Sequence, residues 1–548
     1  MIPQFSLASL DMEEHLYLTA FFAGTLLHVF IFSKNEWDRR SPWIFSFFCF
    51  VFATIVLILD IRYKYHLFAA LLRACVLEGV LLGGLVSSMT VYRLCLHPLR
   101  SFPGPFGARL TAFWFTKESI PDLRFYVKLR TYHDQYGDFV RIRPRELSIR
   151  HPDAVVDVHG PKNKIKKAEF YEQNDPLMSL QMSRDVDFHK HQRKFWDRAF
   201  HNKALTEYTP LLNKHYRIFL DILLTQAETE TPVDASNVLM DLFFDIVSDL
   251  TFGKSFNALT EKRRNPIIGE FLQQQNIVGF LLQQMPLFYL IRCLPFVQER
   301  MNAWIGWYDN ALEERKKMMS VSTDFYTYLS QSEHFKVHGT QEAQLAIIAG
   351  ADTNAITISN ACYLLCQHPK YQKALYQELE DLPTASGIID DEHLTGISLL
   401  SAVIHEVLRL HPPVPGGLQR VTPPSGVTIA GRHIPGNMVI STPTYSIQRD
   451  HRAFPQPDDF IPERWSTRPE LILRKDAFVA FGYGTYNCAG KPLAMLQLRM
   501  VLAMIIQNFE ISVPPGREKE FQQFADEQSD CFTVHLSPLP LRLKRRIH

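Results

Sequence analysis

Three long apolar runs near the N-terminus constrain the fold of this chain more than any other feature. They cover about residues 16–32, 43–59 and 74–92. Because about 20 apolar residues span a bilayer, the sequence predicts up to three transmembrane helices. The third run contains Glu78, and a charge inside a span is costly, so an interfacial hairpin is the alternative for that run.

Charged residues beside these runs indicate an orientation. The extreme N-terminus carries Asp11, Glu13 and Glu14 instead of basic residues, so we expect no cleaved signal peptide. Lys34 and Arg39 follow the first run and favour the cytosolic side, although the next loop is weakly basic as well. With three spans, the N-terminus is lumenal and the rest of the chain is cytosolic.

Composition excludes some functions and predicts reduced thiols. The chain has 58 Lys and Arg against 57 Asp and Glu, so its net charge gives no indication of nucleic-acid binding. Its eight cysteines show no framework of spacings, which is typical of reduced thiols in a cytosol-facing domain.

One of these cysteines lies in a glycine-rich turn near the C-terminus. Residues 481–490 read FGYGTYNCAG and connect an apolar segment to a helical one. The glycines allow close approach to a flat or bulky group, and the helix start after Cys488 favours a thiolate. No cysteine or histidine at zinc-ligand spacing accompanies Cys488, so we expect an axial ligand to haem iron. The alternative is a strand-to-helix turn with a buried cysteine.

An unusual helix is predicted from Thr340, a good N-cap, to about Gln367. Its apolar middle contains Gly350 and the acid–alcohol pair Asp352-Thr353, which are poor choices for a buried helix interior. We expect Gly350 to leave room over the iron and the pair to pass protons to bound oxygen. The alternative is a helix kink with satisfied polar groups.

Two further helices place charges together. His189 and Arg193 share a face at i, i+4 spacing, which is suitable for a dianionic cofactor edge, although a solvated surface helix has the same pattern. Glu406 and Arg409 form an i, i+3 pair, which is weak evidence by itself. The basic run at Lys162, Lys164, Lys166 and Lys167 predicts a solvated loop.

The cysteine stretch resembles the haem-binding signature FxxGxRxCxG of the cytochrome P450 family. Four positions match: Phe481, Gly484, Cys488 and Gly490. Tyr486 stands where the family has an arginine that donates to a haem propionate. Tyrosine supplies one neutral hydrogen bond and no charge, so other basic residues must compensate.

The remaining motifs follow in the family's order, from about Pro103 to the C-terminus. The 187–200 helix resembles the one that grips a propionate through Arg193, with His189 at a position often held by tryptophan or histidine. Asp352-Thr353 resembles the oxygen-activation motif AGxDT. The ExxR and PERW elements are matched by Glu406, Arg409 and Arg464, expected to form a buried network bracing the cysteine loop, and Arg420 matches a second propionate-binding arginine.

The resemblance implies a mainly α haem-thiolate fold with a small β region. It implies a membrane anchor over residues 1–98 and a catalytic domain over 99–548. The implied reaction inserts one oxygen atom from O2 into a lipophilic small molecule, with electrons from NADPH through a reductase, at the endoplasmic reticulum membrane. The chain is similar to membrane-bound fungal members of secondary metabolism, which make terpenoids, polyketides or alkaloids.

Two other functions remain open on the sequence alone. One is a haem-thiolate isomerase or dehydratase that needs no O2, against which the Asp352-Thr353 pair counts. The other is a non-catalytic membrane haem protein, which loss of Cys488 or of the Glu406/Arg409 pair would favour; neither is lost.

Overall fold

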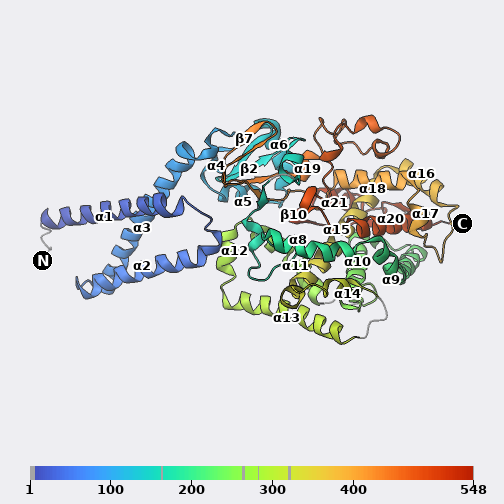
Figure 1. Ribbon diagram of the computed structural model, residues 1–548, viewed down its shortest axis with the longest axis horizontal. Coiled ribbons are helices and arrows are strands. Elements are labelled where there is room, and N and C mark those ends of the chain that lie inside the picture. The colour runs from blue at the N-terminus through green and yellow to red at the C-terminus, as the bar shows by residue number, and fades with distance from the viewer. Residues whose placement is uncertain (1–6, 162–163, 262–265, 282, 319–322, 547–548) are drawn as a thin grey trace. The chain divides into compact units, whose positions relative to one another are not determined.

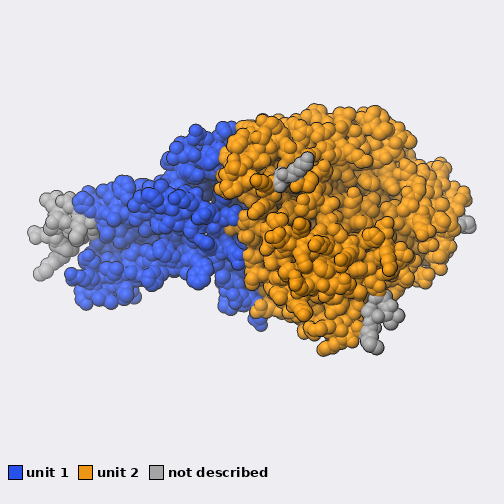
Figure 2. Space-filling model, in the orientation of Figure 1, with its two compact units in different colours: residues 1–117, 141–145, 281–300 blue, residues 118–140, 146–280, 301–548 orange. Residues whose placement is uncertain are grey.

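The computed structural model describes residues 7–161, 164–261, 266–281, 283–318 and 323–546. The chain forms two compact units (Figure 2). Unit 1 comprises residues 1–117, 141–145 and 281–300, and unit 2 comprises residues 118–140, 146–280 and 301–548. The predicted boundary between an anchor ending at residue 98 and a catalytic domain beginning at residue 99 remains a prediction.

Unit 1 contains the three expected apolar helices: α1 (Leu7–Leu27), α2 (Ser41–Ile61) and α3 (Leu67–Val91). With their flanking turns they give three segments long and apolar enough to cross a membrane, Glu14–Phe32, Asp38–Ile61 and Leu67–Leu96. The prediction of three apolar helices is therefore confirmed. Unit 1 also holds α4 (Phe106–Leu110) and α12 (Met285–Ile291).

Small residues let α1 and α3 approach each other closely. A Cβ added to Gly24 would lie 1.9 Å from the Leu81 carbonyl oxygen, and one added to Gly84 would lie 2.0 Å from that of Phe21. Such close backbone contact is typical of helix pairs within a membrane, where packing rather than the hydrophobic effect drives association. Larger residues at either glycine would push the two helices apart.

Unit 2 is mostly helical, as the sequence predicted. Its helices are α6 (Phe125–Tyr136), α7 (Ala154–His159), α8 (Val186–Ala199), α9 (Asn202–Glu228), α10 (Ala235–Phe252), α14 (Phe325–Leu329), α15 (Phe335–Gln367), α16 (Pro369–Leu379), α17 (Asp391–Leu394), α18 (Ser398–Leu410), α19 (Thr444–Ile447), α20 (Lys491–Asn508) and α21 (Glu518–Asp526). Three helices cross or border the division between the units: α5 (Phe113–Ser119), α11 (Pro266–Leu281) and α13 (Pro295–Lys317).

Helix α15 is the central element of unit 2 (Figure 1). It packs against α10, α18 and α20, and most of its side chains from Ala351 to Leu365 are buried. The helix begins at Phe335, so the predicted start at Thr340 was wrong. Thr340 lies inside the helix and its hydroxyl donates to the Asp309 carboxylate, which satisfies it without any capping role.

Short strands form the β region. They are β1 (Phe139–Arg143), β2 (Glu146–Ile149), β3 (Lys166–Lys167), β4 (Val233–Asp234), β5 (Arg420–Val421), β6 (Val427–Ile429), β7 (Arg432–Ile434), β8 (Val439–Ser441), β9 (Phe509–Ser512), β10 (Ser529–Cys531), β11 (Thr533–His535) and β12 (Pro540–Arg545). Within unit 2, one sheet has the order β2-β8-β5-β3, and β6 pairs with β7 in an antiparallel ribbon.

The C-terminal strands belong to two different sheets. β10 pairs with β11, whereas β12 lies between β4 and β9 in a separate sheet. Alternation of apolar residues marks a strand but does not name its partner, so a distant strand was free to replace the neighbouring one.

Candidate functional site

The loop before α20 is shaped by hydrogen bonds and by two glycines. The Cys488 amide donates to the Phe481 carbonyl at 2.8 Å, which closes the turn. Gly482 and Gly484 have φ angles of 70° and 66°, in the region that favours glycine. A Cβ at Gly484 would lie 1.9 Å from the carbonyl oxygen of His159, so this position requires glycine for close packing as well.

Cys488 points its sulfur at the start of α20. The backbone amides of Gly490 and Lys491 hydrogen-bond to the sulfur. Burial nevertheless raises the pKa of the Cys488 thiol, while these amides and the charges of Arg193 and Lys491 oppose the rise. The amides at the helix start thus favour a thiolate, as expected, but burial outweighs them. A bound metal cation is needed to hold the sulfur deprotonated.

The middle of α15 presents one open face. Ala349 is exposed although its helical neighbours are mostly buried, and Thr353, one turn later, is half-buried on the same face. The Thr353 hydroxyl donates to the Ala349 carbonyl at 2.9 Å. A Cβ at Gly350 would meet the Val247 side chain of α10 at 2.7 Å. The close approach of α10 thus favours glycine at position 350, and its expected role of leaving room over the iron remains a prediction.

Asp352 lies on a different face from Thr353 and is fully buried. Burial raises the pKa of its carboxyl to about 7, and the nearby Thr533 and Gln275 side chains oppose the rise. Neither carboxylate oxygen of Asp352 has a hydrogen-bond partner of ordinary geometry among the described residues. Gln275 also accepts at Oε1 from the His535 ring, with 2.5 Å between the heavy atoms if Nδ1 carries the proton. A carboxyl with a pKa near 7 can both hold and release a proton at neutral pH. Sequence reasoning missed Gln275 and Thr533, which no local pattern marks.

Helix α8 contacts the cysteine loop through the two predicted residues. The Arg193 guanidinium donates to the Asn487 carbonyl at 2.7 Å and to the Asp197 carboxylate at 2.6 Å. The buried His189 ring lies edge-on to Tyr486, with 4.7 Å between centroids. Burial and the charges of nearby cations lower the pKa of His189 to about 3, so its imidazole is neutral.

Arg420 and Lys167 are buried cations that stand directly opposite each other on β5 and β3. Their exposed fractions are 2% and 4%. Lys167 donates to the carbonyls of Leu180 and Gln181 at 3.0 and 2.7 Å. In the part of the chain that the structure describes, neither cation forms an ion pair. Like charges directly opposite in a sheet are destabilising, so this pairing has a cost that packing does not explain.

Both cations also face the aromatic ring of Tyr486. The Lys167 Nζ lies 4.9 Å from the ring centroid and the Arg420 Cζ lies 5.2 Å from it. Burial, together with the charge of Arg420, lowers the pKa of Lys167 to about 7. With Arg193 and His189, these residues form a group that we call the cation cluster: Lys167, His189, Arg193, Arg420 and Tyr486.

The prediction that the basic run forms a solvated loop was wrong for Lys167. Lys164 and Lys166 are exposed, as that prediction requires, and Lys162 lies outside the described residues. Lys167 instead turns inward because β3 pairs with β5 and alternate residues of a strand point to opposite faces. The signal that could have identified it is the missing charge at Tyr486, which called for another cation.

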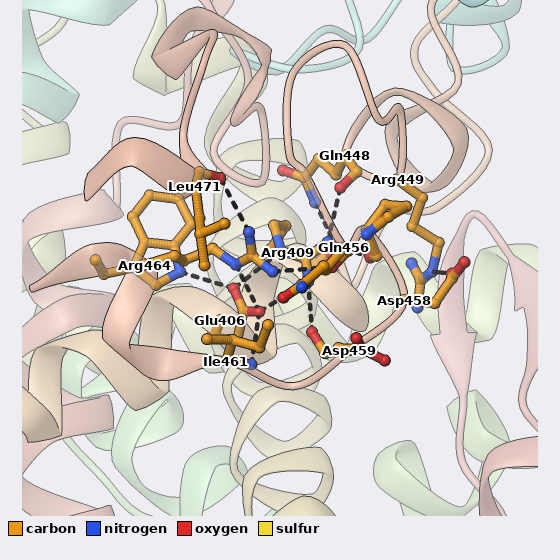
Figure 3. Close-up of polar contacts among 12 residues, drawn as sticks. Glu406, Arg409, Gln448, Arg449, Gln456, Asp458, Asp459, Ile461, Arg464 and Leu471 are labelled. Carbon is orange, nitrogen blue, oxygen red and sulfur yellow. Dashed lines mark hydrogen bonds and ion pairs between the residues drawn. The ribbon is translucent and has the colours of Figure 1, made fainter. Parts of the chain in front are cut away.

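A second set of charges is buried beside α18 (Figure 3). The Arg409 guanidinium donates to both oxygens of Glu406 at 2.8 and 2.9 Å, and Arg464 donates to Oε1 at 2.9 Å. The Trp465 indole and the Ile461 amide also donate to the Glu406 carboxylate, at 2.8 and 3.1 Å. Glu406, Arg409 and Arg464 all have no exposed surface, and we call these three residues the charge network.

The charge network reaches the segment before the cysteine loop. The remaining N–H groups of both arginines donate to the carbonyls of Gln448, Pro455, Gln456, Pro457, Asp459 and Leu471. The Gln448 side chain accepts from the Val479 amide at 2.9 Å and donates to the Arg409 carbonyl at 3.1 Å. Gln448, which sequence reasoning missed, therefore ties the network to the residues that precede Phe481.

The arrangement fits a haem group. Many protein atoms lie near Cys488, but the residue keeps solvent-accessible surface. A ligand atom can therefore approach it. Soft thiolate ligands with amide hydrogen bonds suit haem iron. The cation cluster offers charge for two propionates, which would remove the cost of burying Lys167 and Arg420.

Comparison with known proteins agrees with this geometry. The family model for Cytochrome P450 matches residues 103–540. The cytochrome P450 monooxygenase nodW of Hypoxylon pulicicidum is 33% identical over 529 residues, covering 96% of this chain and 97% of the relative. The monooxygenase phqL of Penicillium fellutanum is 35% identical, covering 96% and 94%. The tryprostatin B 6-hydroxylase of Neosartorya fischeri is 30% identical, covering 86% and 87%.

Proposed function

The chain belongs to the cytochrome P450 family and is a haem-dependent monooxygenase, and from this premise we propose that it oxidises a lipophilic small molecule of fungal secondary metabolism with electrons from NADPH through a reductase. The observation that carries the proposal is the pairing of an accessible thiol at Cys488 with a buried group of uncompensated cations around Tyr486. A thiol alone would suit many metals, and a group of cations alone would suit many anions. A thiolate-ligated haem uses both together, the thiolate for its iron and the cations for its propionates.

Cys488 is the proposed iron ligand. The loop residues Phe481, Gly484 and Gly490 shape its approach, and Arg193, Arg420, His189 and Lys167 hold the propionates, with Tyr486 between them. When bound, the haem supplies the binding and activation of O2 at its iron. The protein contributes the thiolate, the neutralising charge and the exclusion of water.

Asp352 and Thr353 are the proposed proton-delivering residues. Thr353 presents its hydroxyl on the open face of α15, beside Ala349. Asp352 holds a proton at neutral pH because burial raises its pKa to about 7. We assign Thr353 the positioning of water on the open face of α15, where the haem would lie, and Asp352 the resupply of protons.

The substrate is proposed to be apolar and to bind over Ala349. Candidate walls are the 170–186 segment, Leu345, the 414–418 segment and Phe532. Phe170 and Phe532 stack with 5.6 Å between centroids and 12° between planes, which gives an apolar aromatic surface. Phe532 has a φ of 85°, a strained backbone for a bulky residue, and such strain is often found where a side chain is held for function.

The location is proposed to be the endoplasmic reticulum membrane, with unit 2 facing the cytosol. Three apolar helices long enough to span a bilayer support an anchor. Lys190, Lys194 and Arg198 are exposed on α8 and offer positive charge to an acidic electron donor. Because α8 also carries Arg193, such docking would bring the donor close to the haem.

The test is product formation in the presence of labelled oxygen. Membranes with the full-length chain, a cytochrome P450 reductase and NADPH are incubated under ¹⁸O2 with a panel of lipophilic metabolites, and products are found by mass spectrometry. We expect one labelled oxygen atom per oxidised product and dependence on NADPH. Unlabelled products, or turnover that needs no O2, would favour the isomerase or dehydratase alternative.

The proton-delivering role needs a separate variant. Thr353→Ala should lower product formed per NADPH consumed and raise hydrogen peroxide, because protons would reach bound oxygen less selectively. Thr340→Ala is the matched control on the same helix, since its hydroxyl contacts only the exposed Asp309 carboxylate among the described residues. Equal coupling in both variants would remove Thr353 from the proposed mechanism.

A further inference from the structure

A group of two histidines and a glutamate lies outside the proposed haem site. It consists of His191 on α8 together with Glu333 and His334, which directly precede α15. One ligand atom from each residue lies within 4.8 Å of those of the other two. We call these three residues the His-Glu-His group.

The ligand set is suitable for a transition-metal ion. Two imidazoles and one carboxylate bind Zn²⁺ in many protein sites, with a fourth position left for water. In a tetrahedral zinc site with ordinary bond lengths, ligand atoms are roughly 3.4 Å apart. Small rotations of the half-buried His191 and exposed Glu333 side chains would close the remaining distance.

An unpartnered buried nitrogen provides a second, independent observation. The Nε2 atom of His191 has no accessible surface and no hydrogen-bond partner among the described residues. A buried polar atom without a partner costs free energy, and native structures rarely tolerate one. The His191 ring packs edge-on against His334, with 4.9 Å between centroids.

Buried side-chain hydrogen bonds connect the residues that neighbour the His-Glu-His group. Ser332, which precedes Glu333, donates from its hydroxyl to the side-chain carbonyl of Gln192, which follows His191. Gln192 in turn donates to the buried Glu342 at 3.0 Å. The residues next to the ligands are thus fixed to one another, which is the preorganisation that metal sites require.

Ring packing also orients the imidazole of His334. Phe188 lies 5.2 Å from it between centroids and contacts His338 at the same separation. The nearby start of α15 places positive dipole charge beside the group and disfavours a cation. Glu333 supplies the negative charge that offsets this effect, which explains why a carboxylate accompanies the two histidines.

We propose that His191, Glu333 and His334 bind a divalent transition-metal ion of the Zn²⁺ class, joining α8 to the start of α15. The ion links the helix that carries Arg193 to the helix that carries Asp352 and Thr353. It lies outside the proposed haem site and takes no part in the reaction.

The test uses the full-length, haem-loaded protein in detergent, stripped of metals with a chelating resin. Zn²⁺ is titrated against a fluorescent chelator, and bound metal is counted by mass spectrometry after desalting. His191→Phe and His334→Phe keep a ring in each packing position and remove a ligand atom. His451→Ala is the matched control, because its side chain is 82% exposed and lies on another segment.

We expect one Zn²⁺ per chain for the wild type and His451→Ala, with affinity at least about tenfold weaker in each phenylalanine variant. The haem spectrum of all four proteins should be the same, which shows that folding is retained. Absence of saturable binding in the wild type would overturn the proposal. So would equal affinity in the wild type and both phenylalanine variants, because the ion would then bind elsewhere.

Discussion

Two groups of buried positively charged side chains lie in unit 2, and they differ in what neutralises their charge. In the charge network, one carboxylate, Glu406, accepts from Arg409, Arg464, the Trp465 indole and the Ile461 amide. The two arginines donate six further hydrogen bonds to backbone carbonyls. In the cation cluster, Arg420 and Lys167 stand opposite each other without a carboxylate partner among the described residues.

The difference indicates which group is structural and which is for binding. The charge network is complete within the chain, so it stabilises the segment that leads into the cysteine loop. The cation cluster is incomplete within the chain and gains stability only from an anion, which we propose to be the two haem propionates. Removing a charge should therefore have opposite effects on the stability of the haem-free protein in the two places.

Breaking the charge network should give the largest effect. Glu406→Gln leaves Arg409 and Arg464 buried with no carboxylate, and losing one partner of such a buried pair costs about 3–5 kcal/mol. We expect little folded, haem-loaded protein, measured as cytochrome P450 content and as the midpoint of thermal unfolding.

Glu470→Gln is the control for this variant. It breaks an ion pair with Arg468 whose side chains are 47% and 63% exposed, and such pairs contribute at most about 1 kcal/mol. A stable, haem-loaded Glu406→Gln protein would show that the network is dispensable.

Moving a charge within the cation cluster should give the next largest effect. Lys167→Met removes one buried cation, so we expect haem affinity to fall about tenfold, equivalent to about 1.4 kcal/mol, while the haem-free protein is no less stable. Adding Tyr486→Arg returns a cation to the position where the family has one. The double variant should regain most of the haem affinity, measured by haem transfer to an acceptor protein.

The comparison would fail if Lys167→Met destabilised the haem-free protein as Glu406→Gln does. Lys166→Met is the matched control, because it lies one residue away on the same strand and is exposed. Haem loss in that control would mean that the strand, rather than the charge at Lys167, holds the cofactor.

The two groups should also respond differently to pH. The pKa of Lys167 is lowered to about 7, so the folded protein releases this proton before the unfolded chain does. The contribution of Lys167 to the stability of the haem-free protein, measured as wild type minus Lys167→Met, should therefore rise with pH above 7, by up to about 1 kcal/mol between pH 7 and 8. Haem binding should abolish this rise, measured by thermal unfolding at several pH values.

Glu406 affects stability in a different pH range. Burial alone would raise its pKa, but hydrogen bonds and charges from Arg409 and Arg464 bring it below the usual value. Its contribution to stability is therefore present above the carboxylate's ordinary pKa and is lost only as pH falls through the lowered value. An equal change in haem-free stability between pH 7 and 8 in the wild type and Lys167→Met would contradict the assignment of that slope.

Much of the fold was predictable because its signals are local. Uncharged runs of bilayer length identified the apolar helices, and the spacings around Glu406 and Cys488 identified charge and thiol positions. Lys167 was misjudged, and the packing around Gly350 was not foreseen, because the surroundings of both come from distant residues. Strand β5 turns Lys167 inward, and Val247 of α10 occupies the space beside Gly350.

The sequence likewise did not predict which strands pair or which distant side chains meet. β12 pairs with β9 and β4, and Gln275 reaches Asp352 from a helix whose sequence shows no marker of function. The helix start at Phe335 lacked a capping side chain, so the better cap at Thr340 was misleading. Local rules predict which segments fold, whereas tertiary contacts decide what each polar group meets.

The most direct test of the central claim is the reduced carbon monoxide difference spectrum of membranes containing the full-length chain. Wild type and Cys293→Ala, an exposed cysteine used as the control, should both give the band of a thiolate-ligated carbonyl complex. Cys488→Ala should lose it. Bound haem without that band in the wild type, or the band retained in Cys488→Ala, would contradict Cys488 as the iron ligand.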